Sequence, residues 1–155
     1  MSTSNWYKIN DFVKNLAHNC DLETDTPKLA LSNTAPSDET NDPTADGNGV
    51  LGNVTEIDYT DYTDDNNGDR TLSVFSSDQV GGVYSYILED LIVSAVSGGE
   101  LGPFRYIYFF DDTVSSPNKP LITYLDKEES ITLYDGDELV VDLNNNDGIF
   151  NLSQS

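Results

Sequence analysis

The sequence predicts an all-β protein: an antiparallel β-sandwich or jelly-roll-like domain with a short N-terminal helix or arm. Two observations predict this fold. Short apolar or alternating stretches recur about every ten residues from Arg70 onward and are separated by turns rich in Gly, Asn and Asp. One of these turns, Asp135-Gly136, is a strong signal for a tight turn between antiparallel strands. The sequence shows neither an internal repeat nor an alternation of strands with helices, the two features that would indicate another fold class.

The first element is an amphipathic helix in the stretch "SNWYKINDFVKNLAHN". Ser4 is one candidate cap for it, and Asn10 is a candidate cap for a shorter version. Two interpretations stay open: a helix packed on its own domain, or an arm that docks on a neighbour. We therefore divide the chain into a helical arm, 1–20, and a single β-sandwich domain, 21–155. The apolar stripe of the helix follows helical spacing and consists of Trp6, Ile9, Val13 and Leu16, with Phe12 beside it.

The next segment is short of apolar residues. "PKLALSN" predicts one strand, and acidic loops follow at about 34–53 and 61–70. Between Asp21 and Asp69 the chain has thirteen carboxylates and a single base, Lys28. A region of this composition is expected to lie largely on the surface.

Strand signals become dense after Arg70. "RTLSVFSS" predicts a strand and "DQVGG" a turn. "VYSYIL" and "LIVSAV" predict two strands, or one long strand bent at Glu89 and Asp90. "LITYLD" predicts another strand, "SITLYDGDELVVDL" a hairpin around Asp135-Gly136, and "GIFNL" a last strand that closes the sheet.

The stretch "FRYIYFF", residues 104–110, holds five aromatic residues and is apolar on both faces. A strand alternates its side chains, so one face can fill a sandwich core. The other face requires a second layer, the N-terminal helix or another subunit. Arg105 lies among these aromatic residues and requires a carboxylate or an aromatic ring. Asp90 and Asp111 are the candidate carboxylates.

Composition excludes several classes of function. The net charge is −21, from 28 acids and 7 Lys or Arg residues. Such a surface repels nucleic acids and anionic lipid, so we expect neither as a partner. The start of the chain has no basic segment followed by an apolar run, and no stretch is apolar enough to span a bilayer. We expect the protein to fold in a cytoplasm. Cys20 is the single cysteine, so no internal disulfide forms.

The sequence shows no catalytic motif, and we expect neither an enzyme nor a cofactor. His18 is the single histidine and stands two residues before Cys20, a spacing that does not place both on one helix face. The carboxylates are so abundant that no pair of them is informative. The glycine-rich stretches lack the lysine and the strand–loop–helix setting of a phosphate-binding loop.

One segment partly matches a calcium-binding loop. In "DLNNNDGIF", the residues Asp142, Asn144 and Asn146 have the required spacing, but Asp147 stands where the loop needs glycine. The closing Glu is also missing. We therefore expect no specific metal site and interpret this segment as Asn/Asp turn chemistry.

Several stretches, in this order, resemble a family of small virion proteins of tailed bacteriophages. They are "NWYKINDFVKNLAHN", "DTPKLALSNTAPS", "TEIDYT", "GPFRYIYFFDDT", "PLITYLD" and "SITLYDGDELVVDL". The resemblance implies a virion structural protein, a capsid cement (decoration) protein that binds the major capsid protein on the outer capsid surface and stabilises contacts between capsid subunits. It further implies assembly in the host cytoplasm and a homo-oligomer, a dimer or a trimer. The alternatives are a tail or neck structural protein and a carbohydrate-binding adhesion module of the virion.

Interface residues follow from the two apolar features, the helix stripe and the aromatic strand. Aromatic residues and Arg dominate the energetics of protein interfaces. The residues that we expect to contact the capsid or a second copy are Trp6, Tyr7, Ile9, Phe12, Val13, Leu16, Arg105, Tyr106 and Tyr108.

Overall fold

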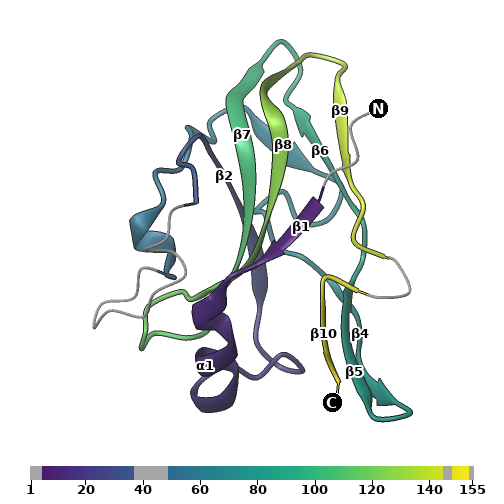
Figure 1. The fold of residues 1–155 in the computed structure, drawn as a ribbon. Helices are drawn as coiled ribbons and strands as arrows, with labels where there is room; N and C mark the ends of the chain where they lie inside the picture. The colour runs from purple at the N-terminus through teal and green to yellow at the C-terminus, as the bar shows by residue number, and fades with distance from the viewer. Residues whose placement is uncertain (1–4, 37–48, 145–147, 154–155) are drawn as a thin grey trace.

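The computed structural model describes residues 5–36, 49–144 and 148–153, and most of them form strands (Figure 1). Strands account for 53% of the structure and helix for 8%. In the described part of the chain, the strands form three antiparallel sheets, and a short helix lies near the N-terminus. This confirms the predicted all-β, sandwich-like domain. A short 3-10 helix at Leu51–Asn53 lies between β2 (Pro27–Ser32) and β3 (Tyr62–Asp64) along the chain.

The largest sheet has four strands in the order β1-β8-β7-β2, all antiparallel. Its centre is formed by the two longest strands of the molecule. The bounds are β1 (Asn5–Lys8), β8 (Leu121–Tyr134), β7 (Glu100–Asp111) and β2 (Pro27–Ser32).

Two smaller sheets accompany it. One has the order β3-β6-β9 and the other the order β10-β5-β4. Figure 1 shows the sheet of β10, β5 and β4 extending away from the rest of the molecule, and we call these three strands the β-arm. The bounds are β3 (Tyr62–Asp64), β6 (Leu91–Ala95), β9 (Glu138–Val141), β10 (Phe150–Ser153), β5 (Val83–Leu88) and β4 (Val74–Val80).

The N-terminus differs from the predicted helix in its first half. The helix α1 spans Asn10–His18, and Ile9 occupies the cap position, so neither Ser4 nor Asn10 caps it. Residues 5–8 instead form β1, with Trp6 opposite Leu125 of β8. The physical reason is tertiary: pairing supplies β8 with a neighbour on its outer side, and aromatic residues are well suited to strands. The segment is therefore part of the main sheet.

The predicted hairpin around Asp135-Gly136 is wrong in its pairing, although the turn is present. Asp137 N–H donates to the Tyr134 carbonyl at 2.9 Å, and Tyr134 N–H donates to Asp137 Oδ2 at 2.9 Å. The two strands then part, because β8 pairs with β7 and β9 pairs with β6. The turn thus connects two different sheets. The predicted strand "LITYLD" and the first half of the hairpin are one continuous strand, β8.

The open question at Glu89 and Asp90 has a definite answer: the chain forms two strands, in different sheets. β5 ends at Leu88 and belongs to the β-arm, whereas β6 begins at Leu91 and lies between β3 and β9. "PKLALSN" and "GIFNL" form β2 and β10 as predicted, and the second of these pairs with β5.

The two predicted acidic loops differ in what the structure describes. Residues 37–48 of the first loop lie outside the described residues. The second predicted loop is wrong for residues 62–64, which form β3 by pairing with β6. The turn that follows β3 is organised by Asp64. Its Oδ1 accepts hydrogen bonds from the N–H groups of Asn66 and Gly68. Its Oδ2 accepts hydrogen bonds from the Arg70 N–H and the Tyr62 hydroxyl, and all four distances are 2.7 to 3.0 Å. Short polar side chains commonly close turns in this way.

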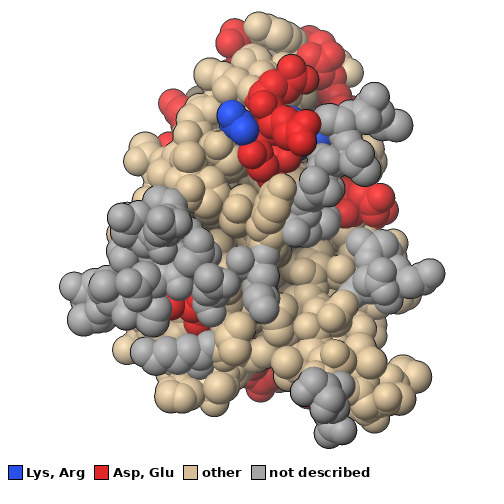
Figure 2. Space-filling view, viewed as in Figure 1, with Lys and Arg blue, Asp and Glu red and all other residues tan. Residues whose placement is uncertain are grey.

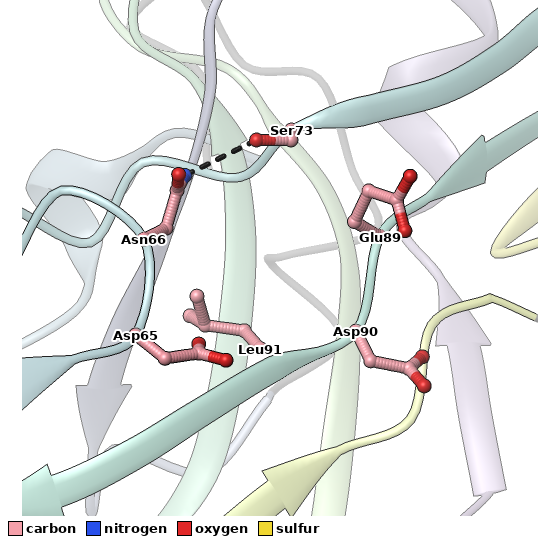
Figure 3. Close-up of a pocket in the computed structure, with 6 residues that line it drawn as sticks. All are labelled: Asp65, Asn66, Ser73, Glu89, Asp90 and Leu91. Atoms are coloured by element: carbon pink, nitrogen blue, oxygen red, sulfur yellow. Dashed lines mark hydrogen bonds between the residues drawn. The ribbon is translucent and has the colours of Figure 1, made fainter.

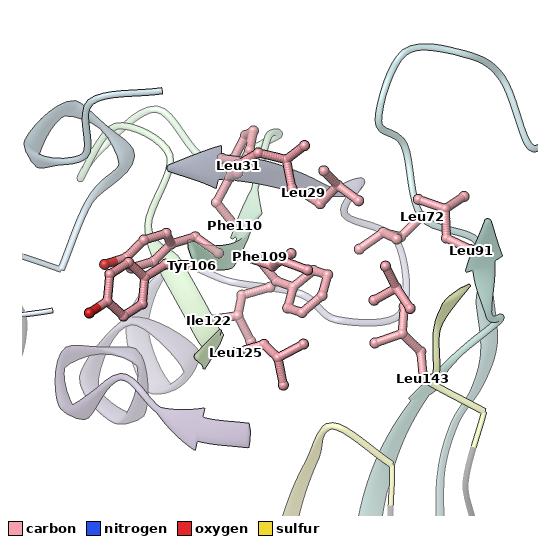
Figure 4. Packing of buried hydrophobic residues seen from close by; sticks show 14 of the residues in the cluster. Leu29, Leu31, Leu72, Leu91, Tyr106, Phe109, Phe110, Ile122, Leu125 and Leu143 are labelled. Carbon is pink, nitrogen blue, oxygen red and sulfur yellow. The ribbon is translucent and has the colours of Figure 1, made fainter. Parts of the chain in front are cut away.

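The aromatic strand β7 is covered on both faces by the chain itself. Ile107 and Phe109 pair with Leu31 and Leu29 of β2 and point toward one side of the sheet. Figure 4 shows Phe109, Ile122 and Leu125 packed between the β2 leucines and a group formed by Leu72, Leu91 and Leu143. This side is the main core.

The opposite face of β7 carries a row of tyrosines. Tyr108 lies opposite Tyr124 of β8, and Tyr124 lies opposite Tyr7 of β1. The Tyr7 and Tyr124 rings are stacked with centroids 5.0 Å apart, and the Tyr108 hydroxyl donates to the Thr34 carbonyl at 2.7 Å. Tyr108 is completely buried. The β7 side chains on this face are therefore buried within the chain itself, without a second subunit.

Candidate interaction surfaces

The structure divides the predicted N-terminal interface residues into buried and exposed ones, except Trp6, whose side chain lies outside what the structure describes. Ile9 and Phe12 are fully buried, and the Phe12 ring meets the Phe150 ring edge-on at 5.3 Å. These two residues are corrected from interface to core, because α1 closes one end of the sandwich. Leu16 is half-buried against the same core. Tyr7 and Val13 remain exposed, at 43% and 49%.

The predicted interface residues of β7 need the same correction. Tyr106 and Tyr108 are buried in the tyrosine row and are not available to a partner. Burial raises the pKa of the Tyr108 hydroxyl, so this group stays protonated and remains a hydrogen-bond donor. The row is a structural element of the main sheet.

Arg105 finds a carboxylate, but neither of the two predicted ones. Its Nε and Nη2 donate to Asp126 Oδ1 and Oδ2 at 2.8 and 2.9 Å, and its guanidinium lies 5.1 Å from the Tyr106 ring centroid. The two hydrogen bonds lower the pKa of Asp126 and raise that of Arg105. A bidentate pair of this kind fixes both side chains. Arg105 is half-exposed and holds the end of the tyrosine row.

Asp111, one of the two predicted partners, lies at the end of β7 and is 1% exposed. Its Oδ1 accepts the N–H groups of Thr113 and Val114, at 2.9 and 3.3 Å. Burial, and next the neighbouring carboxyl of Asp25, raise its pKa to about 6. The half-buried Cys20 adjoins this pair, and burial together with the Asp111 charge raises the pKa of the thiol to about 12. A thiol that stays protonated is a poor nucleophile.

Asp90, the other predicted partner, lines a small acidic pocket of about 220 Å³ (Figure 3). Its Oδ1 accepts the N–H groups of Leu143 and Asn144, both at 2.7 Å. On the other side of the pocket, Asp65 Oδ1 accepts the Ile92 N–H at 2.8 Å. Asp65 therefore binds the backbone of β6, and Asp90 binds the backbone of the segment that follows β9. The full lining is Asp65, Asn66, Ser73, Glu89, Asp90 and Leu91.

In the described part of the chain, the residues that partly match a calcium-binding loop do not come together as a set of metal ligands. Asp142 is exposed, the Asn144 side chain donates to Glu89 Oε2 at 3.3 Å, and Asn146 lies outside the described residues. Within residues 5–36, 49–144 and 148–153, no three His, Cys, Asp or Glu side chains are grouped so that they could hold a metal ion.

The β-arm is the surface that the sequence did not single out. None of the seven residues of β4 is buried, and Val80 at its end is 81% exposed. The exposed apolar side chains of the β-arm come from all three strands: Val74, Phe75, Val80, Val83 and Leu152. Val80 and Val83 lie on one face of the β-arm and Leu152 on the other, so both faces carry exposed apolar side chains. Single exposed apolar residues are ordinary, but such a concentration on one small sheet favours interaction with a partner.

Charge separates this surface from the rest of the molecule. β4, β5 and β10 contain one acid, Asp78, and no base. In Figure 2 the acids gather near the end of the molecule where β8 ends and β7 and β9 begin, whereas the region of the β-arm is mostly free of charge. The cores of protein interfaces are depleted of charged residues in the same way.

The inner side of the β-arm is hollowed. A shallow depression of about 440 Å³ is lined by residues from β4, β5, β10 and the turn between them. At its centre the Tyr84 hydroxyl lies 2.8 Å from Ser77 Oγ. The lining residues are Gln79, Gly82, Tyr84, Leu152 and Ser153.

A signal for the β-arm is present in the sequence. "SVFSSDQVGGVYSYIL" is long, carries one charge and has Gly81-Gly82 at its centre, which is a hairpin signal. Its alternation of apolar and small polar residues does not show which face is covered, because the covering residues come from α1 and β10, far away in the sequence.

Comparisons with known protein families, with curated proteins and with solved structures found no match. Among the described residues, no helix is both long enough and apolar enough to cross a bilayer.

Proposed function

We propose that the chain is a structural protein of a tailed-bacteriophage virion, a cement protein that binds the major capsid protein on the outer surface of the head. The resemblance of its sequence segments to small virion proteins suggests this class. The observation that carries the proposal is the separation of an acidic surface from the β-arm, which has exposed apolar residues and a single charged residue, Asp78, in its three strands. A protein that is held between neighbours needs such an apolar surface, and its outward side can remain strongly charged.

The physical requirements of a cement protein are modest for each copy. Packaged DNA presses on the shell, and additional contacts between capsid subunits oppose its opening. A ligand that binds the closed shell stabilises it by mass action, and many copies act together. A few kcal/mol from each copy is then sufficient. The acidic surface adds solubility and repels nucleic acid.

Copy number is the first test of the proposal. We expect quantitative mass spectrometry of purified particles of the encoding phage to find the chain in hundreds of copies, in a fixed ratio to the major capsid protein. A handful of copies per particle would instead support a tail or neck protein. Absence from the particle would overturn the proposal, and saturable binding on a glycan array would support the carbohydrate-binding alternative.

A pair of matched variants tests the N-terminal surface in capsid binding. Val13 of α1 is 49% exposed and Val140 of β9 is 58% exposed, so an added carboxylate is compatible with folding at either position. We expect Val13→Asp to weaken binding to undecorated capsids by about tenfold, because it desolvates a charge in the contact. Val140→Asp should bind like the unchanged protein. Equal binding of all three proteins would exclude this part of α1 from the contact.

A further inference from the structure

We propose that two copies of this chain pair through the outer edge of β4, so that the three strands of each β-arm join into one continuous antiparallel sheet. The order of strands would be β10-β5-β4 in one copy, followed by β4-β5-β10 in the other. This inference concerns the purified chain alone. It stands or falls independently of the proposed role in the virion.

The outer edge of β4 has backbone groups that a further strand could pair with. β4 is the last strand of its sheet, and it pairs with β5 on one side only within the described part of the chain. It is seven residues long and contains neither Lys nor Pro, which commonly protect edge strands from pairing. One irregularity, between Val74 and Ser76, interrupts it at its start.

The outer edge of β2 shows how this molecule covers an edge elsewhere. Leu29 N–H donates to the Arg70 carbonyl at 3.0 Å, and Ile57 N–H donates to the Leu31 carbonyl at 3.0 Å. Two segments of the chain thus bind the backbone of β2 along its length. The β4 edge has no comparable cover among the described residues.

The hairpin turn after β4 determines which of its backbone groups point outward. Gly81 and Gly82 both have positive φ, 61° and 83°, as a two-residue hairpin turn requires. Val80 and Val83 flank this turn and form a hydrogen-bonded pair, so alternate residues point their N–H and C=O groups outward. Ser77 is one of these outward residues.

The outward backbone groups of β4 also fix the register of the pairing. Gln79, the next outward residue, donates its N–H to Asp78 Oδ1 at 2.7 Å, so the exchange of hydrogen bonds centres on Ser77. A two-fold axis at Ser77 sets Val80 of one copy opposite Val74 of the other. It also sets Asp78 opposite Ser76, so that the two Asp78 side chains are diagonal neighbours and are not directly opposed.

The distribution of charge identifies a second copy of the chain as the partner at the β4 edge. Each copy carries a net charge of −21, so contact through most of its surface would bring acids together. The β-arm, with Asp78 as its one charged residue, is the described surface on which two copies meet with the least repulsion. Self-repulsion of the remaining surfaces makes the pairing dependent on salt, because salt screens exposed charges.

Sedimentation of the full chain at several concentrations tests the pairing. We expect a monomer–dimer equilibrium whose dissociation constant falls by about tenfold when NaCl is raised from about 50 mM to about 500 mM. Ser77→Pro removes the outward N–H and should raise the dissociation constant by about thirtyfold, from the two symmetric hydrogen bonds lost. The matched control Ser77→Ala keeps the N–H and should dimerise like the unchanged protein.

Three outcomes would overturn the inference. They are a monomer at all concentrations in both salts, a dimer that Ser77→Pro leaves unchanged, and an oligomer of higher order than two. If Ser77→Pro does not fold by circular dichroism, Val80→Glu takes its place, since Val80 is 81% exposed. We expect Val80→Glu to weaken dimerisation by about tenfold, and an unchanged dimer would contradict the proposed register.

Discussion

β7 and β4 are both regular strands, yet they differ in almost every property that burial controls. From Tyr106 to Asp111 every residue of β7 is buried, whereas β4 has no buried residue. β7 has a paired strand on both sides, and β4 is paired on one side within the described residues. The main sheet around β7 therefore supplies the stability of the fold, and the β-arm supplies surface.

Strand pairing and core formation are therefore separate contributions to the structure of this chain. Backbone hydrogen bonds add little net stability in comparison with apolar burial. A substitution in the main sheet should thus change the free energy of unfolding, while one in the β-arm should change association.

The largest effect is expected where α1 closes the core. Phe12→Ala should lower the free energy of unfolding by about 4 kcal/mol, because it leaves a cavity beside the Phe150 ring. Its neighbour Val13 is exposed on the same helix, and Val13→Ala should change stability by less than about 0.5 kcal/mol. Urea denaturation measures both. Equal effects would show that α1 does not pack as described.

The tyrosine row should give the next largest effect. Tyr108→Ala should cost about 3 kcal/mol, the scale for truncation of a buried aromatic residue. Tyr108→Phe keeps the ring and removes only the hydrogen bond to the Thr34 carbonyl, so it should cost about 1 kcal/mol. Thermal unfolding followed by circular dichroism checks the order. A larger loss for Tyr108→Phe than for Tyr108→Ala would contradict it.

Asp111 should make stability depend on pH. Its pKa is raised from 3.8 to about 6 in the folded protein, so between these values the folded state binds more protons than the unfolded state. Stability from this group is full below about pH 4 and is lost as pH rises to 6 and above, by roughly 2 to 3 kcal/mol.

The difference between Asp111→Asn and the unchanged protein isolates this contribution. Asp25 and Cys20 face Asp111, and they remain in both proteins. Denaturation at several pH values from 4.5 to 7.5 should show a falling stability with rising pH in the unchanged protein and a flatter curve in the variant. Parallel curves would mean that Asp111 titrates normally.

The smallest effect on stability is expected in the β-arm. Phe75 is 57% exposed, so Phe75→Ser should change the free energy of unfolding by less than about 0.5 kcal/mol, measured on dilute protein at low salt. A loss as large as that of Phe12→Ala would show that the β-arm is part of the core and would remove the contrast between the two regions.

Much of the fold could be predicted, since local patterns determine it. Alternation and turn residues predicted β2, β5, β6 and β7 close to their observed positions. The segment 5–8 could not be predicted as a strand, because its partner β8 lies more than a hundred residues away. The Asp135-Gly136 turn was visible, but a turn does not state which sheet each of its flanking strands will join.

The site residues were less predictable, for a related reason. Apolar side chains in a helix stripe or an aromatic strand are equally suited to a core and to an interface, and only their neighbours decide. Ile9, Phe12, Tyr106 and Tyr108 proved to be core. Arg105 was correctly expected to need a carboxylate, but the shift in register between β7 and β8 places Asp126 beside it.

The position of β8 has a consequence for synthesis. β1 near the start of the chain and β7 both pair with β8, so the main sheet cannot be completed until the ribosome has released Tyr134. Until residues 121–131 have left the ribosome, the tyrosines and phenylalanines of β7 have no cross-strand neighbour on that side. A nascent chain with such distant pairings folds late and is exposed to aggregation, and its abundant carboxylates help to keep it in solution during that interval.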